Sequence, residues 1–300
     1  MFGNYQAKSN LFYLTNPAVM LGLLISWVFL VLLFQQPLYI ISIFVLVNLT
    51  MIFSGNFSNL IRQLKYALPL IIIIILINLL FNQNGTTILG SINVFGWLLN
   101  FYEESLFYGF ISAIKLLTII SAFNFYSLVI DPDEMLNLTR KLGYKISLIV
   151  NMSMRLFPLI AEDYGRIQAI QKHRSLVTVN PTTAEKIKDL VPTMSILLMN
   201  SLDRSLMTSE SLYSRGFNSG NHTVYKQIKW HFTDALLMIN IFLLVICALW
   251  VQMKGLGFYS YYPKISSFMQ INYLVTYILS LLLAFPLLLN WSCKLWAKLN

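Results

Sequence analysis

The chain has 300 residues, of which 57% are hydrophobic and 11% charged, and its formal net charge is +9. A soluble domain typically has about 45–50% apolar and about 25% charged residues, whereas the mean hydropathy here is +0.67. No soluble core buries that much apolar surface, so the composition excludes an ordinary soluble protein. We expect an all-α polytopic protein whose solvent is the lipid bilayer.

Six stretches have the roughly 17–25 mostly apolar residues that a membrane-spanning helix needs. They cover residues 18–34, 37–53, 66–82, 105–130, 234–252 and 272–292. The first four define an N-terminal membrane region, residues 1–130, and the last two a C-terminal hairpin, residues 233–300. Residues 86–100 are apolar but interrupted by Gly and Asn, so we expect an interfacial or re-entrant segment there.

The basic residues predict the orientation of the chain. If the N-terminus is cytoplasmic, eighteen of the 21 lysines and arginines face the cytoplasm, and thirteen of these lie in residues 140–229. The positive-inside rule requires this asymmetry, so both termini are expected in the cytoplasm. The net charge then reflects membrane topology, and no nucleic-acid partner is needed to explain it.

Residues 131–232 predict a cytoplasmic domain of amphipathic helices. Asp131 and Gly143 mark the start and the end of a short first helix. A second helix is expected over residues 145–174, where Ile, Leu and Met recur every three or four positions. A third helix is expected from the capping box at residues 182–185 to about Arg215.

The two long helices each end in an arginine, Arg174 and Arg215. Gly216 follows Arg215, and glycine is preferred just beyond a helix C-terminus. One such arginine is explained by its interaction with the helix dipole and the last carbonyls. Two arginines at matched tips favour docking to a partner, because the planar guanidinium binds a carboxylate bidentately.

The third helix also carries a narrow strip of small residues at four-residue spacing, Ser201, Ser205 and Ser209. Small side chains allow a second helix to cross at close range. The strip therefore predicts a helix-crossing contact.

With these features the chain resembles the T component, the transmembrane coupling subunit, of energy-coupling factor (ECF) transporters. That family is marked by two Ala-Arg-Gly motifs at the tips of two coupling helices. Ser214-Arg215-Gly216 is similar to the second motif, and His173-Arg174-Ser175 falls on the first, of which it keeps the arginine. The segment that leads to Arg174 resembles the family's coupling helix through Arg155, Pro158 and Gln171.

The resemblance implies a scaffold rather than an enzyme. Two ABC-type ATPases would each accept one helix tip and would use ATP, so this chain would bind no cofactor itself. A small membrane protein, the S component, would bind a vitamin or a divalent metal ion such as cobalt or nickel. Ser201, Ser205 and Ser209 would contribute to the contact with it. The location would be a bacterial or archaeal plasma membrane.

Other classes of membrane protein remain as alternatives. A self-sufficient secondary transporter usually carries ionisable residues near the middle of the bilayer, and Lys115 is the one clear candidate. For a membrane enzyme, His173, His222 and His231 lack metal-ligand spacing, and the pair Glu103-Glu104 is interpreted as a solvated helix end. A conventional ABC permease would normally use one coupling helix per subunit.

Overall fold

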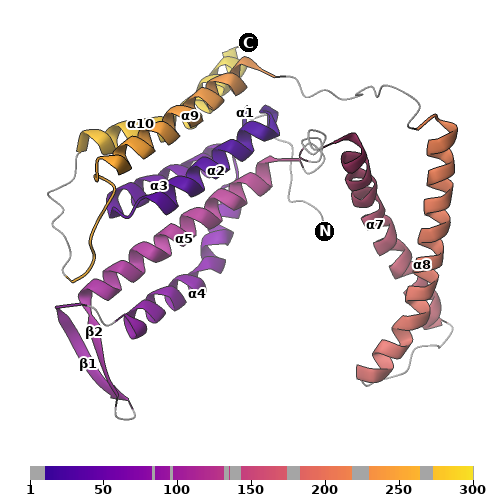
Figure 1. The fold of residues 1–300 in the computed structure, drawn as a ribbon, viewed down its shortest axis with the longest axis horizontal. Coiled ribbons are helices and arrows are strands. Elements are labelled where there is room, and N and C mark those ends of the chain that lie inside the picture. Colours follow the sequence, from indigo (N-terminus) through magenta and orange to yellow (C-terminus); the bar gives the residue numbers. More distant parts are fainter. Residues whose placement is uncertain are drawn as a thin grey trace. The chain divides into compact units, whose positions relative to one another are not determined.

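The structure is a computed structural model, and it describes residues 11–82, 85–94, 97–131, 135, 143–173, 183–217, 230–263 and 273–299. These residues form helices and one small β-hairpin (Figure 1). The chain divides into two compact units. The first comprises Met1–Met135 with Ile228–Asn300, and the second comprises Leu136–Gln227.

The first unit is a helical bundle, and proline or asparagine residues begin its first helices. Pro17 and Pro37 occupy the first helical position, where a missing N–H costs nothing, and the Asn16 side chain accepts a hydrogen bond from the Ala18 amide. The helices are α1 (Leu11–Leu14), α2 (Pro17–Leu33), α3 (Pro37–Phe53), α4 (Phe57–Phe81), α5 (Glu103–Val129), α9 (Phe232–Met253) and α10 (Tyr273–Leu299).

Six apolar helices occupy the six predicted spans. α4, α5, α9 and the Leu274–Ser292 part of α10 are long and apolar enough to cross a membrane. α2 and α3 have 17 residues each, which is the lower end of the range that a span requires. The prediction of an all-α polytopic membrane protein is confirmed.

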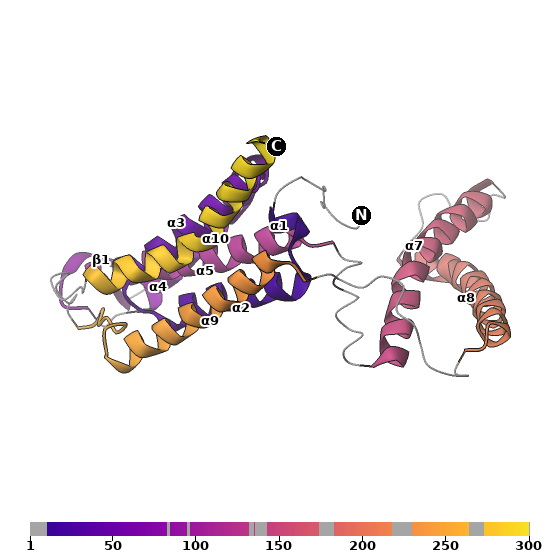
Figure 2. The same ribbon diagram turned by 90° about the horizontal axis from the view of Figure 1, so that it is seen from above.

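The core of the bundle lies around α5, which packs against α2, α3 and α4, while α10 packs against α3 and α9 (Figures 1 and 2). Trp27 of α2 and Phe125 of α5 meet there with their ring centroids 5.7 Å apart. Phe12 packs edge-on against Phe125 at 5.4 Å. Large buried aromatic rings of this kind contribute strongly to packing.

α4 is the most peripheral of the spanning helices, since only 6% of its most apolar window is buried inside the protein. It approaches α5 closely at Gly109. A Cβ atom at Gly109 would lie 3.1 Å from the Asn78 Cβ and 3.3 Å from the Ile75 Cα. Glycine therefore permits this contact, as small residues do between membrane helices.

Residues 86–100 contribute to a β-hairpin rather than to a re-entrant segment. β1 (Ile88–Val94) pairs antiparallel with β2 (Trp97–Tyr102), from Val94 opposite Trp97 to Ile88 opposite Tyr102. A hairpin satisfies the backbone groups that face its partner strand, whereas an open loop in lipid would leave them unpaired.

The hairpin is anchored on the first turn of α5 by Glu104, whose side chain is buried at 2% exposure. Its Oε1 atom accepts hydrogen bonds from the Thr86 amide at 3.1 Å, the Thr86 hydroxyl at 3.0 Å and the Thr87 amide at 3.2 Å. Glu104 is therefore not a solvated helix end, because it is buried and its Oε1 atom accepts these hydrogen bonds from within the protein.

In the second unit the described residues form two long helices, α7 (Tyr144–His173) and α8 (Thr183–Ser214), which lie close to the bounds expected from the sequence. The short helix predicted over residues 131–143 falls outside the described residues, apart from Asp131, Met135 and Gly143. Pro158 and Pro192 lie inside α7 and α8, as the sequence indicated.

Candidate functional site

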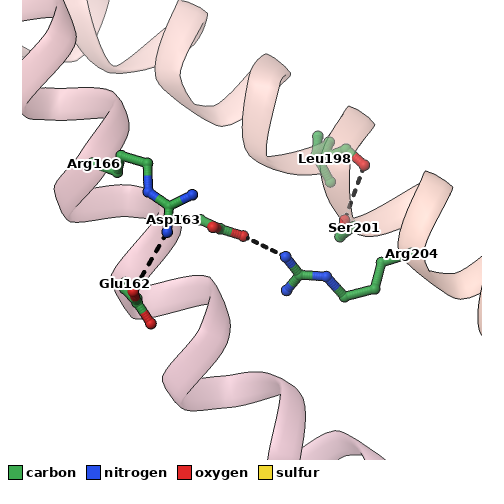
Figure 3. Close-up of polar contacts among 6 residues, drawn as sticks. All are labelled: Glu162, Asp163, Arg166, Leu198, Ser201 and Arg204. Carbon is green, nitrogen blue, oxygen red and sulfur yellow. Dashed lines mark hydrogen bonds and ion pairs between the residues drawn. The ribbon is translucent and has the colours of Figure 1, made fainter.

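Buried apolar residues and polar pairs from both helices lie where α7 and α8 pack against each other. Ile167 of α7 and Leu197 of α8 are buried. Next to them the hydroxyl of Thr193 donates a hydrogen bond to the Gln171 Oε1 atom at 2.7 Å. Further along, the guanidinium of Arg204 reaches from α8 to a carboxylate of α7 (Figure 3).

The pairing makes the two helices antiparallel. Gln171 lies near the end of α7 but meets Thr193 near the start of α8, whereas Asp163 lies earlier in α7 and meets Arg204 later in α8. The C-terminal tips of α7 and α8 therefore lie at opposite ends of the pair. From Thr193 to Ser214 the helix rises by about 30 Å, at about 1.5 Å per residue.

The tip of α8 is closed by a Schellman motif. The Phe217 amide donates to the Leu212 carbonyl at 3.0 Å, and the Gly216 amide donates to the Tyr213 carbonyl at 3.0 Å. Gly216 has φ +75°, the left-handed conformation that the motif requires and that glycine adopts without strain. Arg215 is thus the capping residue, one position beyond the last helical residue, Ser214.

Arg215 is presented to solvent at this tip, together with Ser214 and Gly216. The Ser214 hydroxyl donates to the Ser211 carbonyl at 3.0 Å, so it stays on its own helix. Within the described residues the Arg215 guanidinium forms no hydrogen bond or ion pair. The rigid cap and the unpaired side chain together leave a cation available to a partner.

The tip of α7 is described only up to His173, which is exposed and is the last residue of the helix. Arg174 and Ser175 lie outside the described residues, so their role at this tip stays a prediction.

The three serines of the strip on α8 line two largely apolar grooves between the helices. Ser201 lies in a groove of about 460 Å³ together with Phe157 and Leu198. Ser205 and Ser209 lie in a larger groove of about 590 Å³, which is lined from the α7 side by Met152, Arg155, Leu156 and Leu159.

The serine strip does not form the most buried contact between α7 and α8. That contact is at Thr193 and Leu197, while Ser205 and Ser209 are exposed. The two helices diverge toward the start of α7 and the end of α8, which leaves the larger groove open (Figure 1). A third helix crossing at the strip would therefore have to come from outside the pair.

Exposed apolar side chains continue along α8 beyond the grooves. Among the most exposed are Met199, Leu202, Leu206 and Met207, each at 60–71% exposure. Exposed apolar side chains of this kind are typical of surfaces that contact a membrane or another protein.

Two features bear on the alternative classes, Lys115 for a secondary transporter and a candidate metal site for a membrane enzyme. Lys115 lies in α5, is half-buried and forms no ion pair with any residue the structure describes. Among all the residues that the structure describes, no three His, Cys, Asp or Glu side chains are grouped so that they could hold a metal ion.

A bundle of apolar helices joined to an amphipathic helix pair defines a polytopic membrane protein. The chain belongs to the CbiQ family, described as "Cobalt transport protein", whose sequence model matches residues 8–225. It is thus a membrane component of a transporter.

Curated relatives carry the name energy-coupling factor transporter transmembrane protein EcfT. The protein from Lactococcus lactis subsp. cremoris is 24% identical over 267 residues, which cover 85% of this chain and 98% of that protein. The protein from Exiguobacterium sibiricum is 24% identical over 199 residues, covering 62% and 74%. The protein from Bacillus subtilis is 22% identical over 201 residues, covering 63% and 73%. The predicted resemblance to the T component of ECF transporters is confirmed.

Proposed function

We propose that this chain couples two cytoplasmic ABC-type ATPases to a small substrate-binding S component in an ECF-type importer. The ATPases use ATP, and this chain is a scaffold that binds no cofactor and catalyses no reaction. The cargo is a vitamin or a divalent metal ion such as cobalt or nickel. The description of the family as a cobalt transport protein and the names of the EcfT relatives support this proposal.

The observation that carries the proposal is the separation of the two helix tips. α7 and α8 are antiparallel, so their C-terminal ends lie about 30 Å apart along α8. A single groove on one partner cannot hold both ends. Two ATPases, each with one groove, fit this geometry, with Arg215 at one tip and Arg174 at the other.

Arg215 suits docking because its backbone is fixed by the Schellman motif while its side chain is unpaired among the described residues. A carboxylate on the ATPase would bind the guanidinium fork bidentately. Removing one partner of a buried charge pair costs roughly 2–5 kcal/mol, because the other charge is left desolvated. Ser214, Gly216, His173 and Ser175 would line the contacts at the two tips.

The S component would contact the apolar surface of α7 and α8. The grooves that contain Ser201, Ser205 and Ser209 are open and largely apolar, and membrane helices associate through such small residues. The protein would lie in a bacterial or archaeal plasma membrane, with both termini in the cytoplasm.

The test is co-purification of the ATPases, together with substrate uptake, for variants of the two arginines. Arg215→Ala should weaken ATPase binding by about 30- to 4,000-fold, since about 1.4 kcal/mol is tenfold. Arg215→Lys should be intermediate, because lysine keeps the charge but loses the fork. The double variant Arg174→Ala/Arg215→Ala should lose the ATPases while still inserting into the membrane.

Arg166→Ala is the matched control, because Arg166 is an exposed arginine about two turns before the end of α7 and pairs with Glu162 of the same helix. It should retain the ATPases. Normal ATPase retention and uptake in the double variant would mean that both arginines serve only as helix caps. Uptake by the purified chain alone in liposomes would instead support the secondary transporter.

A further inference from the structure

A groove of about 310 Å³ lies between α4 and α5 of the first unit, and its lining changes from polar to apolar along both helices. On α4, Asn59 and Arg62 line the polar end, and Ala67 and Leu70 line the apolar end. On α5 the order is the same, because Asn124 lies toward the end of the helix and Ile120 one turn deeper. The groove therefore has a polar end and an apolar end.

The change coincides with the edge of the apolar part of α4. The helix begins at Phe57, and polar and apolar residues are mixed up to Lys65, whereas the continuous apolar stretch starts at Tyr66. Tyr66 also lines the groove. Tyrosine is enriched where a spanning helix meets the headgroup layer, so the polar end of the groove lies at headgroup depth and the apolar end at acyl-chain depth.

The polar end is held in shape by hydrogen bonds between helices. Gln63 Nε2 donates to the Ser121 hydroxyl at 2.8 Å, and Asn124 Nδ2 donates to Gln63 Oε1 at 2.6 Å. The Ser121 hydroxyl in turn donates to Asn48 Oδ1 of α3 at 3.3 Å. Gln63 uses both ends of its amide in this network, so it forms part of the wall of the groove.

Two polar groups at the same end are left for a ligand. Neither the Arg62 guanidinium nor the Asn59 amide group forms a hydrogen bond with another side chain among the described residues, and Arg62 has no ion-pair partner there. The lining contains no carboxylate. A groove with one uncompensated cation at the membrane edge is complementary to an anion that carries an apolar tail.

We propose that this groove binds an anionic phospholipid, with its phosphodiester on Arg62 and Asn59 and one acyl chain along Ala67, Leu70 and Ile120. Arginine binds phosphate oxygens through its planar fork, and basic pockets between spanning helices bind anionic headgroups. With the N-terminus in the cytoplasm, as proposed above, the lipid belongs to the cytoplasmic leaflet.

The test is a titration of the purified full chain in detergent with phosphatidylglycerol or phosphatidylcholine, with bound lipid counted by native mass spectrometry. Phosphatidylglycerol should bind more tightly than phosphatidylcholine to the wild type. Arg62→Gln should weaken phosphatidylglycerol binding by about tenfold, equivalent to about 1.4 kcal/mol. Asn59→Leu should give a smaller loss of phosphatidylglycerol affinity. This variant tests the proposal if Arg62→Gln does not fold.

Lys65→Gln is the matched control, because it removes one positive charge from the same helix but from outside the groove. It should leave the affinity near the wild-type value. Equal losses in Arg62→Gln and Lys65→Gln would overturn the proposal, since general attraction of an anionic lipid would explain both. Displacement of the lipid by inorganic phosphate at constant ionic strength would also overturn it, because the groove would then be a site for a free anion.

Discussion

Asp163 of α7 and Arg204 of α8 form an ion pair at 2.9 Å, although they are separated by 41 positions in the sequence (Figure 3). Both side chains are partly covered, with exposures of 14% and 34%. The pair lies between the buried contact at Leu197 and the open groove at Ser205, where the two helices begin to diverge. It thus marks the limit of close packing in the second unit.

We expect this ion pair to stabilise the α7–α8 contact by about 1 kcal/mol, at the upper end of the range for partly exposed pairs. A double-mutant cycle with Asp163→Ala and Arg204→Ala measures the coupling. The readout is urea unfolding of the pair in the nanodisc-embedded full chain, followed by a fluorophore on α8. The pair Glu162–Arg166 at 3.4 Å is the control, because both of its side chains are at least 65% exposed. Its coupling should be at most about 0.5 kcal/mol, and equal couplings would contradict the prediction.

Gly216→Ala should destabilise the tip of α8 by about 1 kcal/mol, because Gly216 has φ +75° and an alanine is strained in that conformation. Gly165→Ala is a control of opposite sign. Gly165 lies inside α7, where an added Cβ would meet nothing within 4 Å, so alanine should stabilise that helix by about 0.5–1 kcal/mol. Hydrogen exchange of the last turn of α8 and of the middle of α7 would measure the two effects. Unchanged exchange at the tip of Gly216→Ala would show that the Schellman motif does not depend on glycine.

Ser205→Leu should weaken assembly with the S component while membrane insertion stays intact. Ser205 lies in the larger groove and its hydroxyl is turned back to the Leu202 carbonyl at 2.8 Å, so a leucine would fill space that a docking helix needs. Ser153→Leu is the control, because Ser153 is an exposed α7 serine that lines neither groove. A Ser205→Leu complex with full S-component content and full uptake would assign the strip to a solvated face.

The proposed orientation is tested by cysteine labelling of intact cells, with the native cysteines replaced. A cysteine at Ile88 in the hairpin or at Phe258 after α9 should react with an impermeant reagent from outside. A cysteine at Tyr213, which is 85% exposed, should react only after the cells are opened. Labelling of the Tyr213 position from outside would place the α7–α8 pair on the wrong side for cytoplasmic ATPases.

The helices of the second unit could be predicted closely because their signals are local. The three- to four-residue apolar period and the glycine after Arg215 predicted ends within about one residue of α7 and α8. Arg215 differs slightly from its expected place as the last helical residue. Because Gly216 adopts the left-handed conformation, the helix ends at Ser214 and Arg215 becomes the C-cap residue.

The parts of the structure that were missed depend on residues far apart in the sequence. The sequence predicts a solvated Glu104, but Thr86 and Thr87 supply its hydrogen bonds from 18 and 17 positions away, respectively. The β-hairpin has too few residues for an apolar period to distinguish it from an interfacial helix. The expected span 66–82 omits the first turns of α4, which begins at Phe57. Hydropathy identifies the lipid-exposed part of a helix, whereas the helix itself continues beyond that part.

The close approach of α4 to α5 at Gly109 has a consequence for how the bundle is assembled. Lipid tails are as apolar as leucine, so a peripheral helix gains little by exchanging lipid for protein. α4 is therefore held by shape at Gly109 and by the hydrogen bonds of Gln63 with Ser121 and Asn124 rather than by hydrophobic burial. Insertion of α4 into the bilayer and its docking on the bundle are therefore separable. A chain in which α4 is inserted but not docked would score as normal in an assay of membrane insertion, although it would lack the groove between α4 and α5.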